Sequence, residues 1–319
     1  MAHIILRSAW RPSRIHCRCN AGWQAHELRI PTPYGFLAAQ EWTKGNGEKN
    51  LLMLHGYQDN ASSFDNLVPH LDPRWRIVAL DFTGQGLSSH LPRGSIYSTD
   101  VFMMDIRRAI TFLGWKEYSL LGHSMGGLTG HHYAATFPRE VEKLVVLDGF
   151  CPMHVPPSKV CGNFRRIMSE HLRLEGKGES DATSYTEEEI VKLYTDSALV
   201  PYLPEDARCL MKRGCRRTAD GRYVLNRDYR IKATYWNRVG RLAMIPFFQN
   251  FRNEMLVVNV VPGLGVSPVG LRKLASACET SCSKFVFTVI EGNHHVHMNK
   301  AAEVGEHVRK FLEGTTKIK

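Results

Sequence analysis

Gly122-His123-Ser124-Met125-Gly126 is the stretch of this sequence that decides the fold. A Gly-x-Ser-x-Gly pentapeptide is a weak signal alone, but here it follows an apolar run at residues 118–121 and opens a helical pattern. A sharp strand-to-helix turn strains its central residue and admits only small neighbours, which explains the two glycines. Such a turn would expose the Ser124 hydroxyl at the carboxyl edge of a sheet, and the Met125 amide at the positive helix end would be able to stabilise an oxyanion.

Outward from this turn, short apolar runs alternate with stretches of helical pattern. The runs do not alternate polar with apolar residues, which predicts strands buried on both faces of a parallel sheet. The succession predicts an α/β fold in three layers with right-handed crossovers. An antiparallel pair at residues 26–42 precedes the predicted parallel strands at 51–54, 76–80, 118–121, 144–147, 255–261 and 285–290 and the helices at 62–71, 99–113, 125–137, 268–279 and 300–313.

One long stretch departs from this rhythm. Between residues 151 and 245 there is no run typical of a buried strand, and helical patterns occupy 163–174 and 186–198. The second opens with Thr186-Glu187-Glu188-Glu189, a capping sequence with acids in its first turn. We therefore predict three parts: a basic N-terminal tail at residues 1–25, a core of residues 26–151 and 246–319, and a helical cap inserted at residues 152–245.

Length and charge narrow the function classes. The 319 residues carry a net charge of +10, of which residues 1–26 hold +4 and residues 152–245 hold +5, from 17 basic and 12 acidic side chains. No basic stripe interleaved with aromatic residues and no nucleic-acid-binding motif spacing is present, so a nucleic-acid partner is not expected. The excess in the insertion has two interpretations: solvated charge on helices, or attraction of an anionic substrate.

The chain ends and cysteines bear on location. The Arg-rich, acid-free start is compatible with a mitochondrial presequence or with an unprocessed tail, and it lacks the apolar region of a secretory signal. None of the eight cysteines forms a Cys-x-x-Cys pair, so we expect reduced thiols and no zinc knuckle. No apolar run approaches the ~18 residues of a spanning helix, so stable membrane insertion is not expected. We expect an intracellular, chiefly cytoplasmic protein, with peroxisomal, vesicular and mitochondrial sites as alternatives; the oligomeric state is unknown.

Four motifs in order resemble the α/β-hydrolase family: Leu54-His55-Gly56-Tyr57, Asp81-x-x-Gly84-x-Gly86-x-Ser88, Gly122–Gly127 and Glu291-Gly292-Asn293-His294. The resemblance covers residues 26–150 and 250–313 and implies the α/β-hydrolase fold, a mostly parallel sheet flanked by helices. Within the family, the sequence is most similar to the serine hydrolase-like, kraken-related proteins. The resemblance implies Ser124 as nucleophile, an oxyanion hole formed at Gly56, Tyr57 and Met125, and a role for His55 in positioning that loop.

The general base requires a histidine, and His294, His295 and His297 crowd one loop. The family pattern implies His294, directly after the Gly-x turn. The other two then pack the loop or lie at the surface, although a His-x-His pair can also chelate a metal. His123 adjoins the nucleophile and is expected to pack under the turn.

The acid of the triad is the least typical part of the sequence. Most family members place it after the strand at 255–261, yet residues 256–277 contain no Asp or Glu. A second placement in this fold is directly after the preceding strand, where Asp148 stands. Asp148 is therefore the predicted partner of His294, with an ordinary strand-end role as the alternative. Asp81 is interpreted as a structural carboxylate.

These residues predict a serine hydrolase that cleaves a small or medium acyl substrate, an ester or thioester, and requires no organic cofactor and no metal. A serine nucleophile argues against dehalogenase or epoxide-hydrolase chemistry, which needs a carboxylate there. Two alternatives stay open: an inactive scaffold that serves as a binding protein, and a carbon–carbon bond hydrolase with the same triad.

Overall fold

A long twisted sheet forms the centre of the molecule. The computed structural model describes residues 17–18, 22–150, 156–177, 183–196, 200–236, 244–264 and 268–315. Within these residues the sheet has nine strands in the order β1-β2-β3-β5-β4-β6-β7-β11-β12. Six neighbouring strands are parallel: β5, β4, β6, β7, β11 and β12. Strands β3, β2 and β1 continue the sheet beyond β5, each antiparallel to its neighbour. Their bounds are β1 Cys17–Arg18, β2 Gln24–Thr32, β3 Gly35–Thr43, β4 Lys49–Leu54, β5 Trp75–Leu80, β6 Tyr118–His123, β7 Val141–Leu147, β11 Glu254–Pro262 and β12 Lys284–Gly292.

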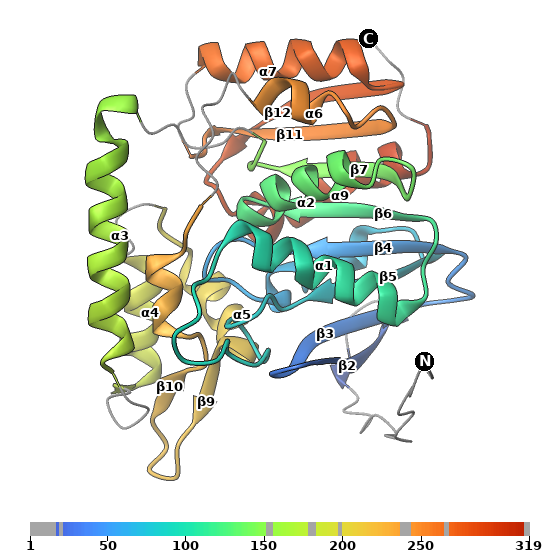
Figure 1. Ribbon diagram of the computed structural model, residues 1–319. Helices are drawn as coiled ribbons and strands as arrows, with labels where there is room; N and C mark the ends of the chain where they lie inside the picture. The colour runs from blue at the N-terminus through green and yellow to red at the C-terminus, as the bar shows by residue number, and fades with distance from the viewer. Residues whose placement is uncertain are drawn as a thin grey trace, which may run out of the picture.

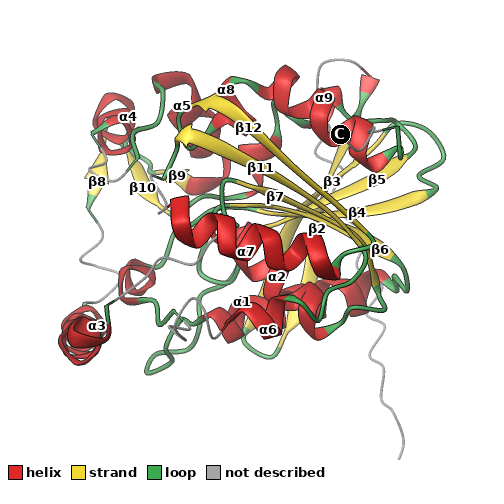
Figure 2. Ribbon diagram, turned by 90° about the horizontal axis from the view of Figure 1, so that it is seen from above, coloured by secondary structure: helices red, strands yellow, loops and turns green. Residues whose placement is uncertain are grey.

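Helices cover both faces of this sheet, and each face has its own apolar core. Helices α1, α2, α6 and α7 lie on one side and α9 lies on the other (Figure 2). This three-layer arrangement is the α/β-hydrolase fold predicted from the sequence, which is confirmed. The bounds are α1 Thr99–Leu113, α2 Met125–Thr136, α6 Ile245–Phe248, α7 Pro268–Ser281, α8 Val296–Asn299 and α9 Ala301–Leu312.

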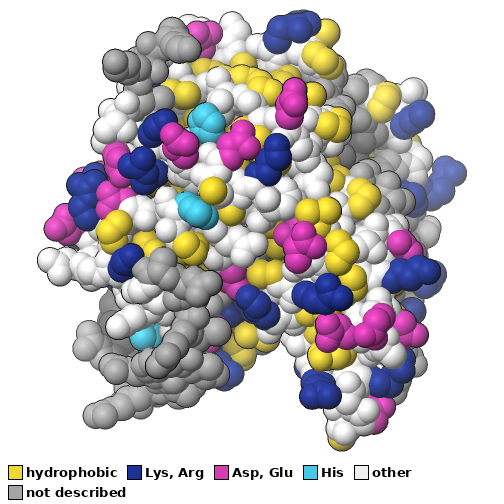
Figure 3. Space-filling view, turned by 180° about the vertical axis from the view of Figure 1, so that it is seen from behind, with side chains coloured by type: hydrophobic (Ala, Val, Ile, Leu, Met, Phe, Trp, Pro, Cys, Tyr) yellow, Lys and Arg dark blue, Asp and Glu magenta, His cyan; other side chains and the backbone are white. Residues whose placement is uncertain are grey.

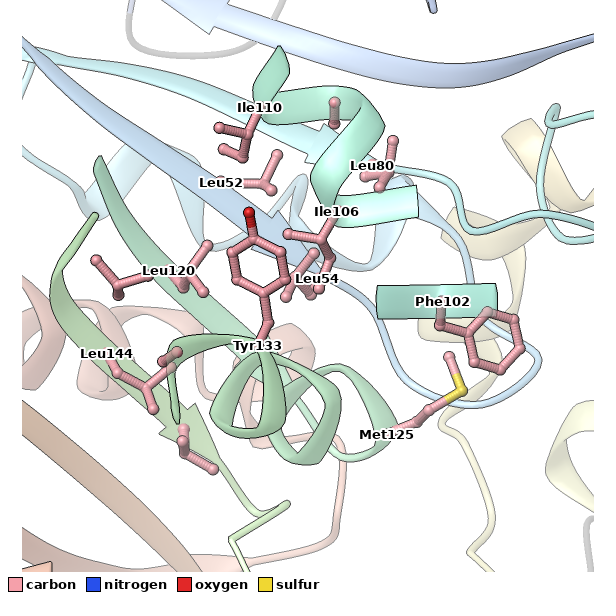
Figure 4. Packing of buried hydrophobic residues seen from close by; sticks show 14 of the residues in the cluster. Leu52, Leu54, Leu80, Phe102, Ile106, Ile110, Leu120, Met125, Tyr133 and Leu144 are labelled. Atoms are coloured by element: carbon pink, nitrogen blue, oxygen red, sulfur yellow. The ribbon is translucent and has the colours of Figure 1, made fainter. Parts of the chain in front are cut away.

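Packing under α2 fixes the turn that precedes it. Tyr133 of α2 lies beside Ile106 of α1 and Leu54 of β4, and the Met125 side chain points toward Phe102 (Figure 4). All five side chains are buried. Deleting one such side chain costs about 2–5 kcal/mol, so the start of α2 is held firmly against the sheet.

An insertion follows β7 and lies at the end of the sheet to which the parallel strands point (Figure 1). We use the name "insertion" for its described residues, 156–177, 183–196 and 200–236. Ile190, Tyr194, Ala207 and Leu210 form the centre of its own apolar cluster. Its elements are α3 Val160–Glu175, α4 Glu187–Thr195, α5 Pro204–Gly214, β8 Ser184–Tyr185, β9 Cys215–Arg217 and β10 Tyr223–Leu225.

The structure departs from the sequence prediction in three places. The helix predicted at 62–71 is two 3₁₀ turns, Ala61–Phe64 and Val68–His70, because Pro69 lacks the amide that a continuous helix needs. The insertion contains a three-stranded antiparallel sheet, β8-β10-β9, as well as helices. Strand β12 was predicted to be buried on both faces; this is wrong, because β12 is the last strand of the sheet and Val289 is 55% exposed.

The surface and the chain ends complete the picture. On the face in Figure 3, basic and acidic side chains are interspersed. The predicted tail lies outside the described residues apart from Gly22–Ala25 and Cys17–Arg18, which pairs with β2. Within the described part of the chain, no helix has the length and apolar character to cross a bilayer.

Candidate active site

Ser124 occupies the tight turn between β6 and α2. Its backbone has φ 52° and ψ −117°, a conformation that residues other than glycine rarely adopt. The turn closes so tightly that a Cβ at Gly122 would lie 2.3 Å from the Gly126 carbonyl oxygen, and one at Gly126 would lie 2.1 Å from the Leu54 oxygen. The glycines are thus required by contact. Ser124 is partly exposed while its neighbours on both sides are buried, so its hydroxyl is the accessible group of the turn.

His294 and Asp148 form a close buried pair. The Nδ1 atom of His294 lies 2.6 Å from Oδ2 of Asp148, and the two residues are only 5% and 6% exposed. Because a carboxylate only accepts, Nδ1–H is the donor, which leaves Nε2 of the neutral ring with a lone pair. Burial and the nearby His123 lower the pKa of His294, and the Asp148 carboxylate partly opposes this shift. His294 is therefore a neutral imidazole with its tautomer fixed.

The end of β11 and the loop after it supply donors to Asp148 instead of an acid of their own. The amides of Leu264 and Val260 lie 3.2 and 3.4 Å from the two carboxylate oxygens. Asp148 itself has φ 42°, and its amide donates to the Val258 carbonyl at 2.8 Å. A Cβ at Gly263 would lie 2.6 Å from Oδ2, so glycine is needed there. Residues 260–264 of the acid-free stretch therefore pack against the Asp148 carboxylate.

The loop after β4, which contains the predicted oxyanion motif, is held in place by His55. His55 is fully buried, its Nδ1–H donates to the Gly56 carbonyl at 2.7 Å, and its Nε2 accepts from the Phe82 amide at 3.0 Å. The ring thus holds the loop against β5. Across the described residues, the amides of Met125 and Tyr57 have no acceptor in the protein. Met125 directly follows Ser124 in the chain, and Tyr57 lines the same pocket as Ser124.

His123 belongs to a second carboxylate–histidine pair. Its Nε2–H donates to the His294 carbonyl at 2.9 Å, and its Nδ1 lies 3.6 Å from Asp59 Oδ2. Burial opposes the charge of Asp59, but His123, His295 and the Tyr202 hydroxyl outweigh it and lower the pKa of Asp59 to about 2. The hydrogen bond from His123 therefore helps to hold the backbone of His294 in place.

The remaining histidines of the loop pack rather than face the turn. His295 stacks on Tyr202 with ring centroids 3.6 Å apart, and His297 lies under His123 with centroids 3.9 Å apart. Both are buried, and burial lowers the pKa of His295 to about 3. In the described portion of the chain, no group of three or more His, Cys, Asp or Glu residues could hold a metal ion.

A pocket of about 210 Å³ opens above Ser124 and is shared by core and insertion. The insertion residues Tyr202 and Arg227, like Asp59 of the core, were not predicted from the sequence as site residues. Asp59 lies three residues beyond Gly56 of the oxyanion motif, which was a usable signal, whereas no motif marks the other two. Asp81, predicted to be structural, accepts from the Ala61 and Leu87 amides outside the pocket. The lining includes Tyr57, Ser124 and His294 from the core and Tyr194, Tyr202 and Arg227 from the insertion.

Comparison with known proteins gives consistent matches. A family described as "alpha/beta hydrolase fold" matches residues 49–171. A serine hydrolase-like protein of Danio rerio is 32% identical over 91% of this chain and 89% of its own length. Serine hydrolase-like protein 2 of Homo sapiens is also 32% identical, over 91% of this chain and 94% of its own. A hypothetical protein from Pseudomonas aeruginosa superposes with a TM-score of 0.77 at 28% identity, over 91% of this chain and 98% of that one.

Proposed function

The chain belongs to the α/β-hydrolase family, and on that premise we propose that it is a serine hydrolase that cleaves a carboxylic ester or thioester through an acyl-enzyme on Ser124. The observation that carries the proposal is the 2.6 Å contact between His294 and Asp148, beside a serine held at positive φ. The alternative of an inactive scaffold rested on a missing acid. The contact of Asp148 with His294 supports the hydrolase over that alternative.

In the proposed reaction, Nε2 of His294 takes the Ser124 proton as the hydroxyl oxygen attacks the acyl carbonyl. The amides of Met125 and Tyr57 stabilise the oxyanion, with Gly56 shaping their loop. His294 returns its proton to the departing alcohol or thiol. Water then attacks the acyl-enzyme with His294 again as base, which releases the acid and restores Ser124. Asp148 stabilises the imidazolium and fixes its tautomer.

The insertion acts in this proposal as a cap that sets the substrate. Its side chains close one side of the pocket and shield a bound acyl chain from bulk solvent. A pocket of about 210 Å³ is smaller than the ~300–1,000 Å³ of typical ligand sites, which favours short acyl chains.

Hydrolysis of 4-nitrophenyl esters from acetate to decanoate, with matched thioesters, tests the proposal on the wild type and on Ser124→Ala. We expect turnover that falls with acyl length and a loss on the order of 10⁶ in kcat in the variant. Equal turnover by both proteins would contradict a role for Ser124. If the protein were instead a carbon–carbon bond hydrolase, the wild type would show almost no turnover of any ester in the series.

A further inference from the structure

Arg227 brings a positive charge into the pocket that holds Ser124. It lies just beyond β10, is partly buried and lines the pocket. Its guanidinium carbon is 5.9 Å from the ring centroid of Tyr194, another lining residue. The charge also reaches Tyr57: burial raises the pKa of that phenol, and the charge of Arg227 opposes the rise.

The backbone on both sides of Arg227 is fixed. The Asn226 amide donates to the Gly214 carbonyl at 2.8 Å, and its side-chain amide donates to the Arg213 carbonyl at 2.8 Å. The Asp228 amide donates to the Gly84 carbonyl of the core, also at 2.8 Å. Arg227 is therefore held between two anchored neighbours, so little backbone ordering remains to be lost when a ligand binds.

Neighbouring arginines of the insertion have carboxylate partners. Arg213 bonds to Asp81 and Glu27, Arg222 to Glu189, and Arg230 to Asp228. No carboxylate among the described residues lies within 4.0 Å of the Arg227 guanidinium. A partly buried cation without a counterion is costly unless a ligand supplies one.

The one acid of the described residues that lines the same pocket does not neutralise Arg227. Asp59 is only 2% exposed; one of its carboxylate oxygens accepts from the Tyr202 hydroxyl, and the other lies 3.6 Å from Nδ1 of His123. Arg227 also lines a second cavity of about 860 Å³ together with Arg93, Lys177, Arg216 and Arg230, against the acids Glu175 and Asp228. The second cavity therefore carries an excess of basic side chains next to Arg227, which draws anions toward this part of the molecule.

We propose that Arg227 binds an anionic group of the substrate, so that the pocket selects esters or thioesters that carry a carboxylate or a similar anion. The planar guanidinium pairs with a carboxylate through two parallel hydrogen bonds, a contact that a neutral ester cannot make. This inference rests on the proposed hydrolase function and specifies its substrate class. It favours the substrate-attracting interpretation of the +5 charge of the insertion.

The test compares mono(4-nitrophenyl) glutarate with its methyl ester, each corrected for spontaneous hydrolysis. We expect the wild type to prefer the anionic ester in kcat/KM by about tenfold or more, which corresponds to ~1.4 kcal/mol. Arg227→Gln should abolish the preference and Arg227→Lys should keep part of it. Arg216→Gln removes the same charge from an exposed residue that lines only the second cavity, and should keep the full preference. No preference in the wild type, or the same preference in Arg227→Gln, would overturn the proposal.

Two further arms complete the design. Comparing 3-carboxyphenyl butyrate with phenyl butyrate tells whether the anion belongs to the leaving group instead of the acyl chain. The second arm measures, by calorimetry, how tightly monomethyl glutarate and dimethyl glutarate bind to the Ser124→Ala protein. This measurement does not depend on turnover. If monomethyl glutarate binds more tightly than dimethyl glutarate, and Arg227→Gln removes this difference, the anion site is supported even if the protein cleaves no ester. The absence of ester cleavage would overturn only the hydrolase function. Equal binding of the two compounds would overturn the anion site.

Discussion

Asp148 and Asp59 each lie beside a histidine next to Ser124, but only Asp148 is hydrogen-bonded to its histidine: Nδ1 of His294 lies 2.6 Å from Asp148, whereas Nδ1 of His123 lies 3.6 Å from Asp59. Nε2 of His123 is bonded to the His294 carbonyl, whereas His294 uses Nδ1 for Asp148. A sequence motif was enough to predict His294 as the base. For the acid, the sequence left two possible positions in the fold, and Asp148 occupies one of them. The choice depends on a contact between residues 146 positions apart, which local patterns do not encode.

Asp148→Asn should therefore cut kcat by a factor on the order of 10⁴, because an amide no longer fixes the reactive tautomer of His294. Asp59→Asn is the matched control: it makes the same change in a carboxylate that is equally buried, and we expect a loss of less than about tenfold. Steady-state kinetics with unchanged circular dichroism separate the two. Equal losses would show that Asp148 has no special role.

The lowered pKa of His294 sets the acid limb of activity. The base must be neutral, so kcat/KM for a neutral ester should fall only when the pH drops below the 6.5 of an unperturbed histidine. The Asp148 carboxylate raises the pKa of His294, so Asp148→Asn should move the limb to lower pH still. A pH–rate profile measures both. A wild-type limb centred above pH 7 would be incompatible with this base.

At the scale of elements, Arg213 of α5 joins the insertion to the core. Its guanidinium donates to Asp81 at 2.8 Å, and the two side chains are 4% and 0% exposed. The sequence motif identified Asp81 as structural, but nothing in it indicated a partner 132 residues away. The β9–β10 hairpin had a readable signal in Asp220-Gly221, a typical turn pair, which the strand search missed because the strands have only three residues each.

Arg213→Met should lower the free energy of unfolding by about 3–5 kcal/mol, because it leaves the Asp81 carboxylate buried and unpaired. Arg208→Met serves as the control, since the Arg208–Glu187 pair is exposed and worth under about 1 kcal/mol. Urea denaturation of both variants provides the measurement. Similar losses in the two would mean that the insertion is held by other contacts.

At the scale of the whole molecule, buried histidines make folding sensitive to acid. Burial lowers the pKa of His55, His131, His132, His294, His295 and His297. The unfolded chain binds protons that the folded chain does not, so stability is full above the unfolded pKa of about 6.5 and declines as the pH falls below it. Composition alone could not predict this, because it depends on which histidines the sheet and the insertion enclose.

His131 allows a direct test of this acid sensitivity of folding. It stacks on Phe248 with centroids 3.9 Å apart, and burial lowers its pKa to about 3. Between pH 7 and pH 5 it should account for about 2 kcal/mol of lost stability, which His131→Phe removes. His307→Phe, at a partly exposed position of α9, is the control for the same substitution outside the core. Urea midpoints at the two pH values decide: the same loss in His131→Phe and the wild type would refute the account.

The central claim is that Ser124 is a nucleophile activated by His294 and Asp148. Labelling with a fluorophosphonate, followed by mass spectrometry of the modified peptide, tests it most directly because the reagent needs the activated serine but no knowledge of the substrate. We predict one label on Ser124 in the wild type, none in Ser124→Ala, and strongly slowed labelling in His294→Ala and Asp148→Asn. A folded wild-type protein that takes no label, or a label that persists in Ser124→Ala, would contradict the claim.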